Sequence, residues 1–361
     1  MADDVLLPFE KDLAGKHVLV TGHTGFTGSW LCLWLARIGV QVTGVALPPP
    51  TTPALFDDAN VAPLLAGHHL ADIRDPDAMR RLIRDTAPDI VLHLAAQPLV
   101  REAYAAPVET FATNVMGTVH VLEAARTAGI AGTVCVTTDK VYLNREWIHP
   151  YRETDRLGGH DPYSASKASA ELAIASYRTS LTSWKQKMVI ATARGGNIVG
   201  GGDWAADRLV PDLARAAIAG RPLTLRHPNA TRPWQHVLCL VHGYLMLMAG
   251  IAAGRGQIDG DWNLGPVECG ELSVGEVVKQ MCRSWPDLAV NFEPSSLHEA
   301  GRLALDCTKA VRQLGWQPAW SMAESIDRTA EWYAAYQRAP ENAAAVTVAQ
   351  IGAYRNALAG R

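Results

Sequence analysis

Short runs of β-branched and apolar residues alternate with longer helical patterns through the first half of the chain. The expected strands are residues 17–21, 40–46, 90–94, 132–137 and 189–193, and the expected helices are residues 25–39, 108–128 and 163–178. Apolar strands separated by helices are typical of a parallel sheet whose crossover helices cover both faces. The pattern therefore predicts an α/β fold built on a doubly wound parallel sheet.

The pattern changes after Arg194. Loops are indicated there by a glycine cluster and by several prolines, namely Gly195, Gly196, Gly200, Gly201, Gly202, Pro211, Pro222, Pro228 and Pro233. Beyond the loops, short strands mix with helices, which we expect at residues 273–285 and 323–336. The alanine-rich tail after Pro340 is predicted to form a surface helix.

We therefore predict two units, with a boundary close to the glycine cluster. The first is a domain over residues 1–196 that contains the parallel sheet. The second is a smaller mixed α/β lobe over residues 197–361, from which segments such as residues 236–255 are expected to pack back on the first domain. A chain of 361 residues is long enough for two cores.

The composition and net charge of the chain argue against several classes of binding partner. The formal net charge is −3, from 33 Lys and Arg against 36 Asp and Glu, so no basic surface for nucleic acid is indicated. The six cysteines form no C-x-x-C pair or metal-ligand spacing, and Cys32 and Cys135 are predicted to be buried thiols in a reducing compartment. No apolar run has transmembrane length, and the first residues are acidic rather than basic. We expect a soluble, cytoplasmic protein without a metal site, nucleic-acid partner or membrane partner.

A glycine-rich turn follows the first predicted strand and opens the first helix. Glycines at this spacing let the backbone turn tightly and approach a pyrophosphate at the helix N-terminus. The residues expected to contact a dinucleotide there are Gly22, His23, Thr24, Gly25, Phe26, Thr27 and Gly28. The alternative is a tight turn without a ligand, but the place of the turn on the first strand–helix unit favours cofactor binding.

The loop after the second strand leaves the choice between NAD and NADP open. An NAD site usually has Asp or Glu near this point to hold the ribose hydroxyls. Residues 45–50 contain neither an acid nor an arginine. Further along, Asp72 and Ile73 are predicted either to contact the adenine or to form a surface turn.

Tyr163 and Lys167 are the first candidate catalytic pair. Four residues apart, they share one face of a helix that Asp161-Pro162 is placed to begin. A nearby ammonium lowers the pKa of a phenol, so Tyr163 is predicted to accept a proton from a hydroxyl while hydride leaves the same carbon.

Thr138, Asp139 and Lys140 follow a predicted strand and should emerge at its carboxyl end, where a parallel sheet binds its ligand. A threonine can hydrogen-bond the oxygen being oxidised, and a protonated Asp can donate to a departing hydroxyl. A lysine kept neutral by the ammonium of Lys167 can remove a carbon-bound proton. The alternative is a surface turn. An extra acid and base beside Tyr163 and Lys167 favour a second reaction in the same pocket, such as loss of water.

At this level the chain resembles the extended short-chain dehydrogenase/reductases, and among them the sugar-nucleotide 4,6-dehydratases. The resemblance runs from about Gly15 to Trp332. It is carried by residues 21–31, 95–101, 114–120, 138–147, 161–167, 200–204 and 232–236. It implies a Rossmann domain with tightly bound NAD and a redox-neutral loss of water from a nucleotide sugar.

The residues at 139 and 140 point to one branch of that family. Most members carry Asp-Glu where this chain has Asp139-Lys140, and the lysine resembles the branch that acts on CDP-glucose. The resemblance therefore implies a CDP-hexose as partner and CDP-4-keto-6-deoxyglucose as product. The chain departs from the family in the missing acid after the second strand and in Val141, where cysteine is expected.

The resemblance also implies further contacts. Cofactor contacts are expected at Ala95, Ala96, Gln97, Asn114, Thr137, Tyr163 and Lys167, and substrate contacts at Asn197, Arg208, Arg232, His298 and Arg302. The helices over residues 108–128 and 163–178 have apolar positions on both sides, which favours pairing across a homodimer axis; burial within one chain gives the same pattern. Three alternatives to this function are a nucleotide-sugar 4-epimerase, a 4,6-dehydratase for another nucleotide hexose, and a non-catalytic nucleotide sensor.

Overall fold

A seven-stranded parallel sheet lies at the centre of the computed structural model, which describes residues 5–181, 188–225, 227–267, 272–293 and 303–361. The strand order is β11-β6-β5-β4-β1-β2-β3. The strands are β1 (His17–Thr21), β2 (Gln41–Ala46), β3 (Gly67–Leu70), β4 (Ile90–His93), β5 (Gly132–Val136), β6 (Val189–Arg194) and β11 (Gly260–Asn263). The five strands predicted from the sequence are present with ends within one residue of the prediction, so the doubly wound α/β fold is confirmed.

Alternate residues of the central strands belong to two separate cores, because side chains of a strand point to opposite faces. Val20 and Val134 lie in one core, whereas Leu19 and Cys135 lie in the other. Both Cys32 and Cys135 are buried free thiols, as predicted.

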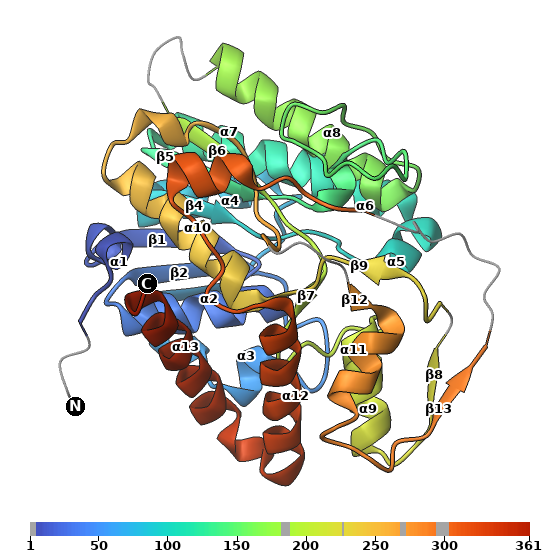
Figure 1. The fold of residues 1–361 in the computed structure, drawn as a ribbon. Helices are drawn as coiled ribbons and strands as arrows, with labels where there is room; N and C mark the ends of the chain where they lie inside the picture. Colours follow the sequence, from blue (N-terminus) through green and yellow to red (C-terminus); the bar gives the residue numbers. More distant parts are fainter. Residues whose placement is uncertain (1–4, 182–187, 226, 268–271, 294–302) are drawn as a thin grey trace.

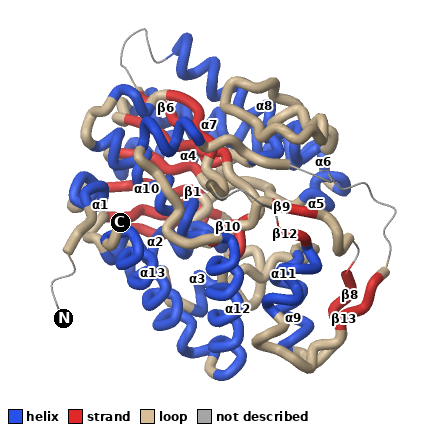
Figure 2. The backbone as a smooth tube through the Cα atoms, viewed as in Figure 1, coloured by secondary structure: helices blue, strands red, loops and turns tan. Residues whose placement is uncertain are grey.

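Helices cover each face of the sheet (Figures 1 and 2). On one face, α2 (Phe26–Arg37) packs against α10 (Val237–Ala252), which also contacts α1 (Pro8–Leu13) and strands β4, β5 and β6. On the other, α7 (Thr118–Ala128) packs between α4 (Pro76–Thr86) and α8 (Pro162–Ser176). None of the described helices is long and apolar enough to cross a membrane.

The second half of the chain contributes to both the sheet and a separate set of small elements. Strand β11 joins the central sheet, and helix α10 packs against it. The boundary between two domains at residue 196 therefore stays a prediction. The remaining elements gather beyond the carboxyl ends of the strands (Figure 1). They are α9 (Leu209–Ile218), α11 (Val274–Met281), α12 (Met322–Arg338) and the strand pairs β7 (Ile198–Val199) with β10 (Gln235–His236), β8 (Leu223–Leu225) with β13 (Val290–Phe292), and β9 (Thr231–Arg232) with β12 (Leu272–Ser273).

The tail helix, α13 (Ala343–Ala359), differs from the surface helix that we predicted. One of its faces is buried against α2 and α12, and Ile351 and Tyr354 are fully covered. The guanidinium of Arg355 donates to both carboxylate oxygens of Glu10 on α1, each at 2.8 Å. The alanine-rich composition does not reveal this packing, because two of the partners, α1 and α2, lie more than 300 residues away in the sequence. Helix α13 is therefore bound to α1 by this buried ion pair.

The long helix predicted over residues 108–128 is helical but irregular. It begins as α6 (Pro107–Phe111), continues as a π-helical segment, η2 (Ala112–Gly117), and ends as α7. π-Helical segments inside helices are frequent at functional sites. This one contains Asn114, a predicted cofactor residue.

Candidate active site

The glycine turn brings the loops after β1 and β4 into close contact. Gly22 has a φ of +78°, and a Cβ on it would lie 2.7 Å from the backbone nitrogen of Ala95. A Cβ on Gly28 would lie 2.4 Å from the carbonyl oxygen of Gly22. Both positions therefore require glycine. Because the strand order reverses between β1 and β4, this is also where a doubly wound sheet binds its ligand. The turn fits a dinucleotide.

The next two residues of the turn connect it to β2 and β3. His23 is buried, its Nε2 lies 2.7 Å from Nδ1 of His68, and burial lowers its pKa to about 4. The hydroxyl of Thr24 donates to the carbonyl of Leu47 at 2.8 Å. Leu47 lies in the loop that lacks the expected acid, so the turn contacts that loop through the backbone.

Asn114 connects the loop after β4 with helix α8. Its Oδ1 accepts from the backbone nitrogen of Gln97 at 2.9 Å, and its Nδ2 donates to the hydroxyl of Ser166 at 2.9 Å. The side chain is buried. It thus holds the loop containing Ala95, Ala96 and Gln97 beside the helix that carries Tyr163.

Asp72 and Ile73 follow β3 at the same edge of the sheet. The carboxylate of Asp72 pairs with Arg74 at 2.6 Å, and this hydrogen bond lowers the pKa of Asp72. Ile73 is buried, and its side chain lies where a Cβ on Gly117 would be. Their predicted contact with adenine stays a prediction.

Asp139 is a buried acid at the carboxyl end of β5, with 2% of its surface exposed. Its Oδ1 accepts from the hydroxyl of Thr138 at 2.9 Å, and its Oδ2 accepts from Nδ2 of Asn197 at 3.0 Å. Burial raises the pKa of Asp139, although Lys140, Thr138 and Arg232 each oppose that shift. Lys140 follows in the short helical turn η3 (Asp139–Val141) and is half-buried.

Gly196 makes room for this acid. A Cβ on Gly196 would lie 2.3 Å from Cγ and from both oxygens of Asp139. The loop after β6 is also joined to the loop after β5 by the backbone bond from Asp139 to the carbonyl of Gly195 at 3.2 Å. Asp139 is therefore enclosed by residues that lie nearly 60 positions further along the chain.

Tyr163 lies on the first turn of α8, which is capped by the carboxylate of Asp161. The Thr138 hydroxyl donates to Asp139 and also acts on the pKa of the phenol, so Thr138 connects Tyr163 with Asp139. Burial raises the pKa of Tyr163 to about 12, while Thr138 and the charge of Arg208 oppose that shift. The predicted lowering of this pKa is therefore wrong, because the loss of hydration on burial outweighs the effects of Thr138 and Arg208.

Lys167 lies one turn after Tyr163 and is buried. Its ammonium donates to the carbonyl of Val136, the last residue of β5, at 3.0 Å. Burial lowers the pKa of Lys167 to about 8, and the Glu171 carboxylate is the first of the groups that oppose this shift.

Three predicted substrate residues reach the same cluster from the second lobe. Asn197 has a φ of +50° and contacts Asp139 directly. Arg208 donates to Oδ2 of Asp203 at 3.0 Å and acts on the pKa of Tyr163. Arg232, at the end of β9, acts on the pKa of Asp139. His298 and Arg302 lie outside the described residues.

Sequence reasoning missed two residues that support the cluster, Glu171 and Arg194. Both are buried, and they form a two-pronged ion pair between α8 and β6 with distances of 2.9 and 2.8 Å. Glu171 was detectable as an acid four residues after Lys167. Its partner was not, because the spacing within a helix says nothing about the neighbouring strand.

Comparison with known proteins agrees with this geometry. The family model described as GDP-mannose 4,6 dehydratase matches residues 19–329. CDP-glucose 4,6-dehydratase from Salmonella typhimurium is 44% identical over 331 residues, which cover 90% of this chain and 92% of that protein. dTDP-glucose 4,6-dehydratase from Haemophilus influenzae is 26% identical, with 88% of this chain and 97% of that protein covered.

Solved structures show the same fold with cofactor bound. UDP-glucose 4-epimerase from Stenotrophomonas maltophila, with bound NAD, has a TM-score of 0.77 at 25% identity and covers 90% of this chain and 99% of its own. A dTDP-glucose 4,6-dehydratase from Streptomyces venezuelae, with NAD bound, has a TM-score of 0.71 at 26% identity, covering 88% and 96%. The chain therefore belongs to the nucleotide-sugar dehydratases of the extended short-chain dehydrogenase/reductases, the family that the GDP-mannose 4,6 dehydratase model describes.

Proposed function

We propose that this protein is an NAD-dependent CDP-glucose 4,6-dehydratase, which converts CDP-glucose to CDP-4-keto-6-deoxyglucose and water. The observation that carries the proposal is the buried Asp139, joined through Thr138 to Tyr163 and followed by Lys140. The 44% identity with the Salmonella enzyme supports CDP as the nucleotide.

Oxidation at C4 is assigned to Tyr163, Thr138 and Lys167. Tyr163 accepts the O4 proton, and the Thr138 hydroxyl, which donates to Asp139 and acts on the pKa of the phenol, is assigned to the same sugar oxygen. Burial raises the pKa of the Tyr163 phenol, and the positive charge of Lys167, one turn further along α8, is assigned to oppose that shift and to stabilise the phenolate that accepts this proton. NAD, bound at the glycine turn, supplies a hydride acceptor that becomes the donor later in the cycle.

Elimination is assigned to Lys140 and Asp139. The new ketone acidifies the C5 hydrogen, which Lys140 removes as a proton. Burial raises the pKa of Asp139, which favours the protonated form that is assigned to donate to the departing C6 hydroxyl. Hydride addition at C6 and return of the proton to C5 complete the product. One water is lost and no net oxidation takes place.

The cofactor is proposed to be NAD rather than NADP. Residues 45–50 offer no arginine for a 2′-phosphate, and two related structures contain NAD. The clamp for the substrate pyrophosphate is assigned to Arg208 and Arg232, whose guanidinium groups match phosphate oxygens.

A nucleotide-sugar 4-epimerase is the second candidate, because UDP-glucose 4-epimerases have this fold and carry bound NAD. Such an enzyme needs Tyr163 and Lys167 but has no use for an enclosed acid at 139 with a base at 140. The dehydratase accounts for all four residues.

The direct test is to incubate the purified protein with CDP-, dTDP-, UDP- and GDP-glucose in parallel. We expect a 4-keto-6-deoxy product, which absorbs in strong base, from CDP-glucose at the highest rate. An epimer without that absorbance would establish the second candidate, and binding without any product would indicate a sensor.

We also infer a homodimer formed through α6 and α8. Exposed apolar side chains gather on these helices and the segments next to them, namely Tyr104, Val108, Phe111, Met116, Leu172 and Leu181. A glutamate at Val108 or Leu172 should give monomers in light scattering. The same change at Leu64, an exposed leucine elsewhere, is the control. If the variants with glutamate at Val108 and at Leu172 both remain dimers, this interface is refuted.

A further inference from the structure

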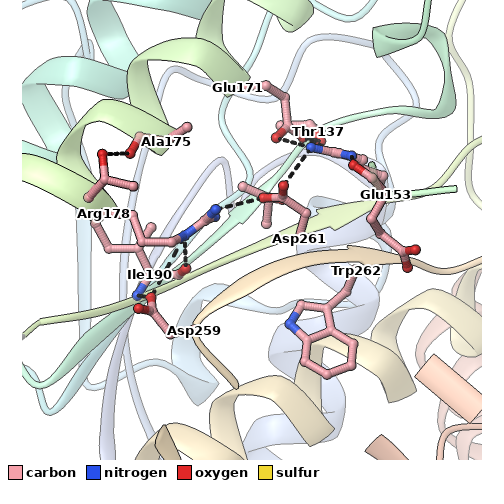
Figure 3. Close-up of polar contacts among 12 residues, drawn as sticks. Thr137, Glu153, Glu171, Ala175, Arg178, Ile190, Asp259, Asp261 and Trp262 are labelled. Atoms are coloured by element: carbon pink, nitrogen blue, oxygen red, sulfur yellow. Dashed lines mark hydrogen bonds and ion pairs between the residues drawn. The ribbon is translucent and has the colours of Figure 1, made fainter. Parts of the chain in front are cut away.

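The buried carboxylate of Glu171 connects the two strands that end beneath the active site with the helix that carries Tyr163 and Lys167. Glu171 lies on α8 one turn after Lys167 and is 2% exposed. Its Oε1 accepts from the hydroxyl of Thr137 at 2.5 Å and from Nε of Arg194 at 2.9 Å, and its Oε2 accepts from Nη2 of Arg194 at 2.8 Å. Figure 3 shows Glu171 beside Thr137.

Thr137 and Arg194 connect Glu171 with the residues that carry the proposed chemistry. Thr137 directly precedes Thr138 and Asp139, so the bond from its hydroxyl fixes the backbone from which both emerge. Arg194 ends β6 and directly precedes the loop that encloses Asp139. Glu171 therefore sets the distance between α8, with its proton acceptor, and the carboxyl end of β5, with its acid.

Arg194 is itself held from several sides. Its Nη1 donates to the phenol oxygen of Tyr142 at 3.0 Å, and its Nη2 lies 3.0 Å from Oδ2 of Asp261 on β11. Asp261 also pairs with Arg178 at 2.9 Å, a contact visible in Figure 3. Two guanidinium groups thus alternate with two carboxylates, and the Glu171 end of this row lies nearest to Lys167.

The charges around Lys167 make Glu171 its main anionic neighbour. Glu171 and Cys135 act on the pKa of Lys167, and Lys167 acts on that of His93. The other titratable groups on α8 and on the elements packed against it are Tyr163 on α8, Arg101, Glu102 and Tyr104 on α5, Glu109 on α6, His120, Glu123 and Arg126 on α7, Asp139 and Lys140 on η3, Tyr177 and Arg178 on η4, and Arg194 on β6. Burial lowers the pKa of His93 to about 3 and raises that of Cys135 to about 12, so both are neutral at pH 7. Burial also raises the pKa of Asp139, which favours its protonated form.

We propose that Glu171 is a positioning residue for the dehydratase reaction, which keeps Lys167 charged and holds α8 in register with the acid on β5. The proposal rests on the function proposed above. It assigns to Glu171 no contact with substrate or cofactor, and its effect passes through Lys167, Thr137 and Arg194.

Glu171→Gln separates charge from shape. The amide keeps an acceptor for Thr137 and most of the volume, but it removes the negative charge. Lys167 is useful when protonated, its pKa is about 8, and Glu171 raises that value. Loss of the charge should therefore move the alkaline fall in kcat toward neutral pH by roughly one unit. At the pH optimum of the wild type, kcat should fall by roughly tenfold to a hundredfold with KM for CDP-glucose nearly unchanged.

Two further variants distinguish this role from a purely structural one. Glu171→Asp keeps the charge on a shorter side chain, so its kcat should fall while its alkaline limb stays where the wild type has it. Glu123→Gln is the matched control, because Glu123 forms the same two-pronged pair with Arg126 on α7, at 2.8 and 2.6 Å, away from Lys167. Its pH profile should equal that of the wild type.

The outcomes are separable. An E171Q enzyme that is slower by the same factor at every pH would overturn the proposal. So would an E171D enzyme whose alkaline fall in kcat shifts as far toward neutral pH as that of E171Q. Should E171Q fail to fold, the comparison of E171D with the wild type still tests the proposal. A shift of the alkaline fall in kcat in E171D would contradict the claim that the charge at position 171 keeps Lys167 protonated. If the wild type makes no 4-keto-6-deoxy product, the proposed function fails rather than the inference about Glu171.

Discussion

Replacing Gly196 by alanine should separate the oxidation half of the reaction from the elimination half. The added Cβ would lie 2.3 Å from the carboxyl carbon and both oxygens of Asp139, whereas ordinary contacts begin at 3.4 Å. The carboxyl group must therefore retreat by about 1 Å. It cannot do so freely, because Thr138 and Asn197 hold its two oxygens. A misplacement of that size at a catalytic group costs roughly a hundredfold in rate.

Oxidation at C4 does not use Asp139, so it should survive in G196A. We expect absorbance of reduced nicotinamide to appear after CDP-glucose is added, while the product that absorbs in strong base forms about a hundred times more slowly than in the wild type. The two signals are read on the same sample, and thermal denaturation verifies that the variant is folded.

Gly352→Ala is the control for the added methyl group. Gly352 lies within α13, and a Cβ there would meet nothing within 4 Å. Turnover should be unchanged and stability equal or higher, because alanine is the better helix former. Wild-type turnover in G196A, without accumulation of reduced nicotinamide, would refute the assignment of Asp139 as the acid.

Three further substitutions test separate parts of the structure. Tyr163→Phe should lower kcat by roughly 10²- to 10⁴-fold without accumulation of reduced nicotinamide, and a burst of that absorbance would assign the first proton transfer elsewhere. Asp139→Asn should accumulate reduced nicotinamide while product formation falls; normal product formation removes Asp139 from the mechanism. Glu10→Ala should lower the free energy of unfolding by about 3–5 kcal/mol, because it removes the buried carboxylate that both Arg355 and Trp34 contact. Asp12→Asn, at the more exposed pair with Arg255, should cost under about 1 kcal/mol, and equal effects in urea denaturation would contradict this difference.

The fold was largely predictable because the central strands are buried on both faces. Continuous apolar residues such as 90–92 indicate such strands directly, and their ends were located within one residue. Strand β11 was not predicted, since Gly260–Asn263 has few apolar residues and joins the sheet only by pairing with β6. The buried face of α13 was missed for a similar reason, because its contacts with α1 and α2 depend on tertiary structure.

The residues of the candidate site could be predicted from the sequence, but their burial and their contacts could not. The positions of Asp139 and Tyr163 followed from strand ends and helix spacing. The enclosure of Asp139 did not, because it depends on Gly196 and Asn197 in a distant loop. The direction of the Tyr163 pKa shift was misjudged for the same reason, since burial is a property of the folded chain.

The most direct measurement follows the hydrogen at C4 of the sugar. CDP-glucose carrying deuterium at C4 is incubated with the purified protein and NAD, and the product is analysed by NMR and mass spectrometry. Our account predicts CDP-4-keto-6-deoxyglucose with the deuterium in the C6 methyl group, because the hydrogen removed from C4 is returned to C6 within the same site. A CDP-hexose with the deuterium still at C4 and the C6 hydroxyl intact would contradict it.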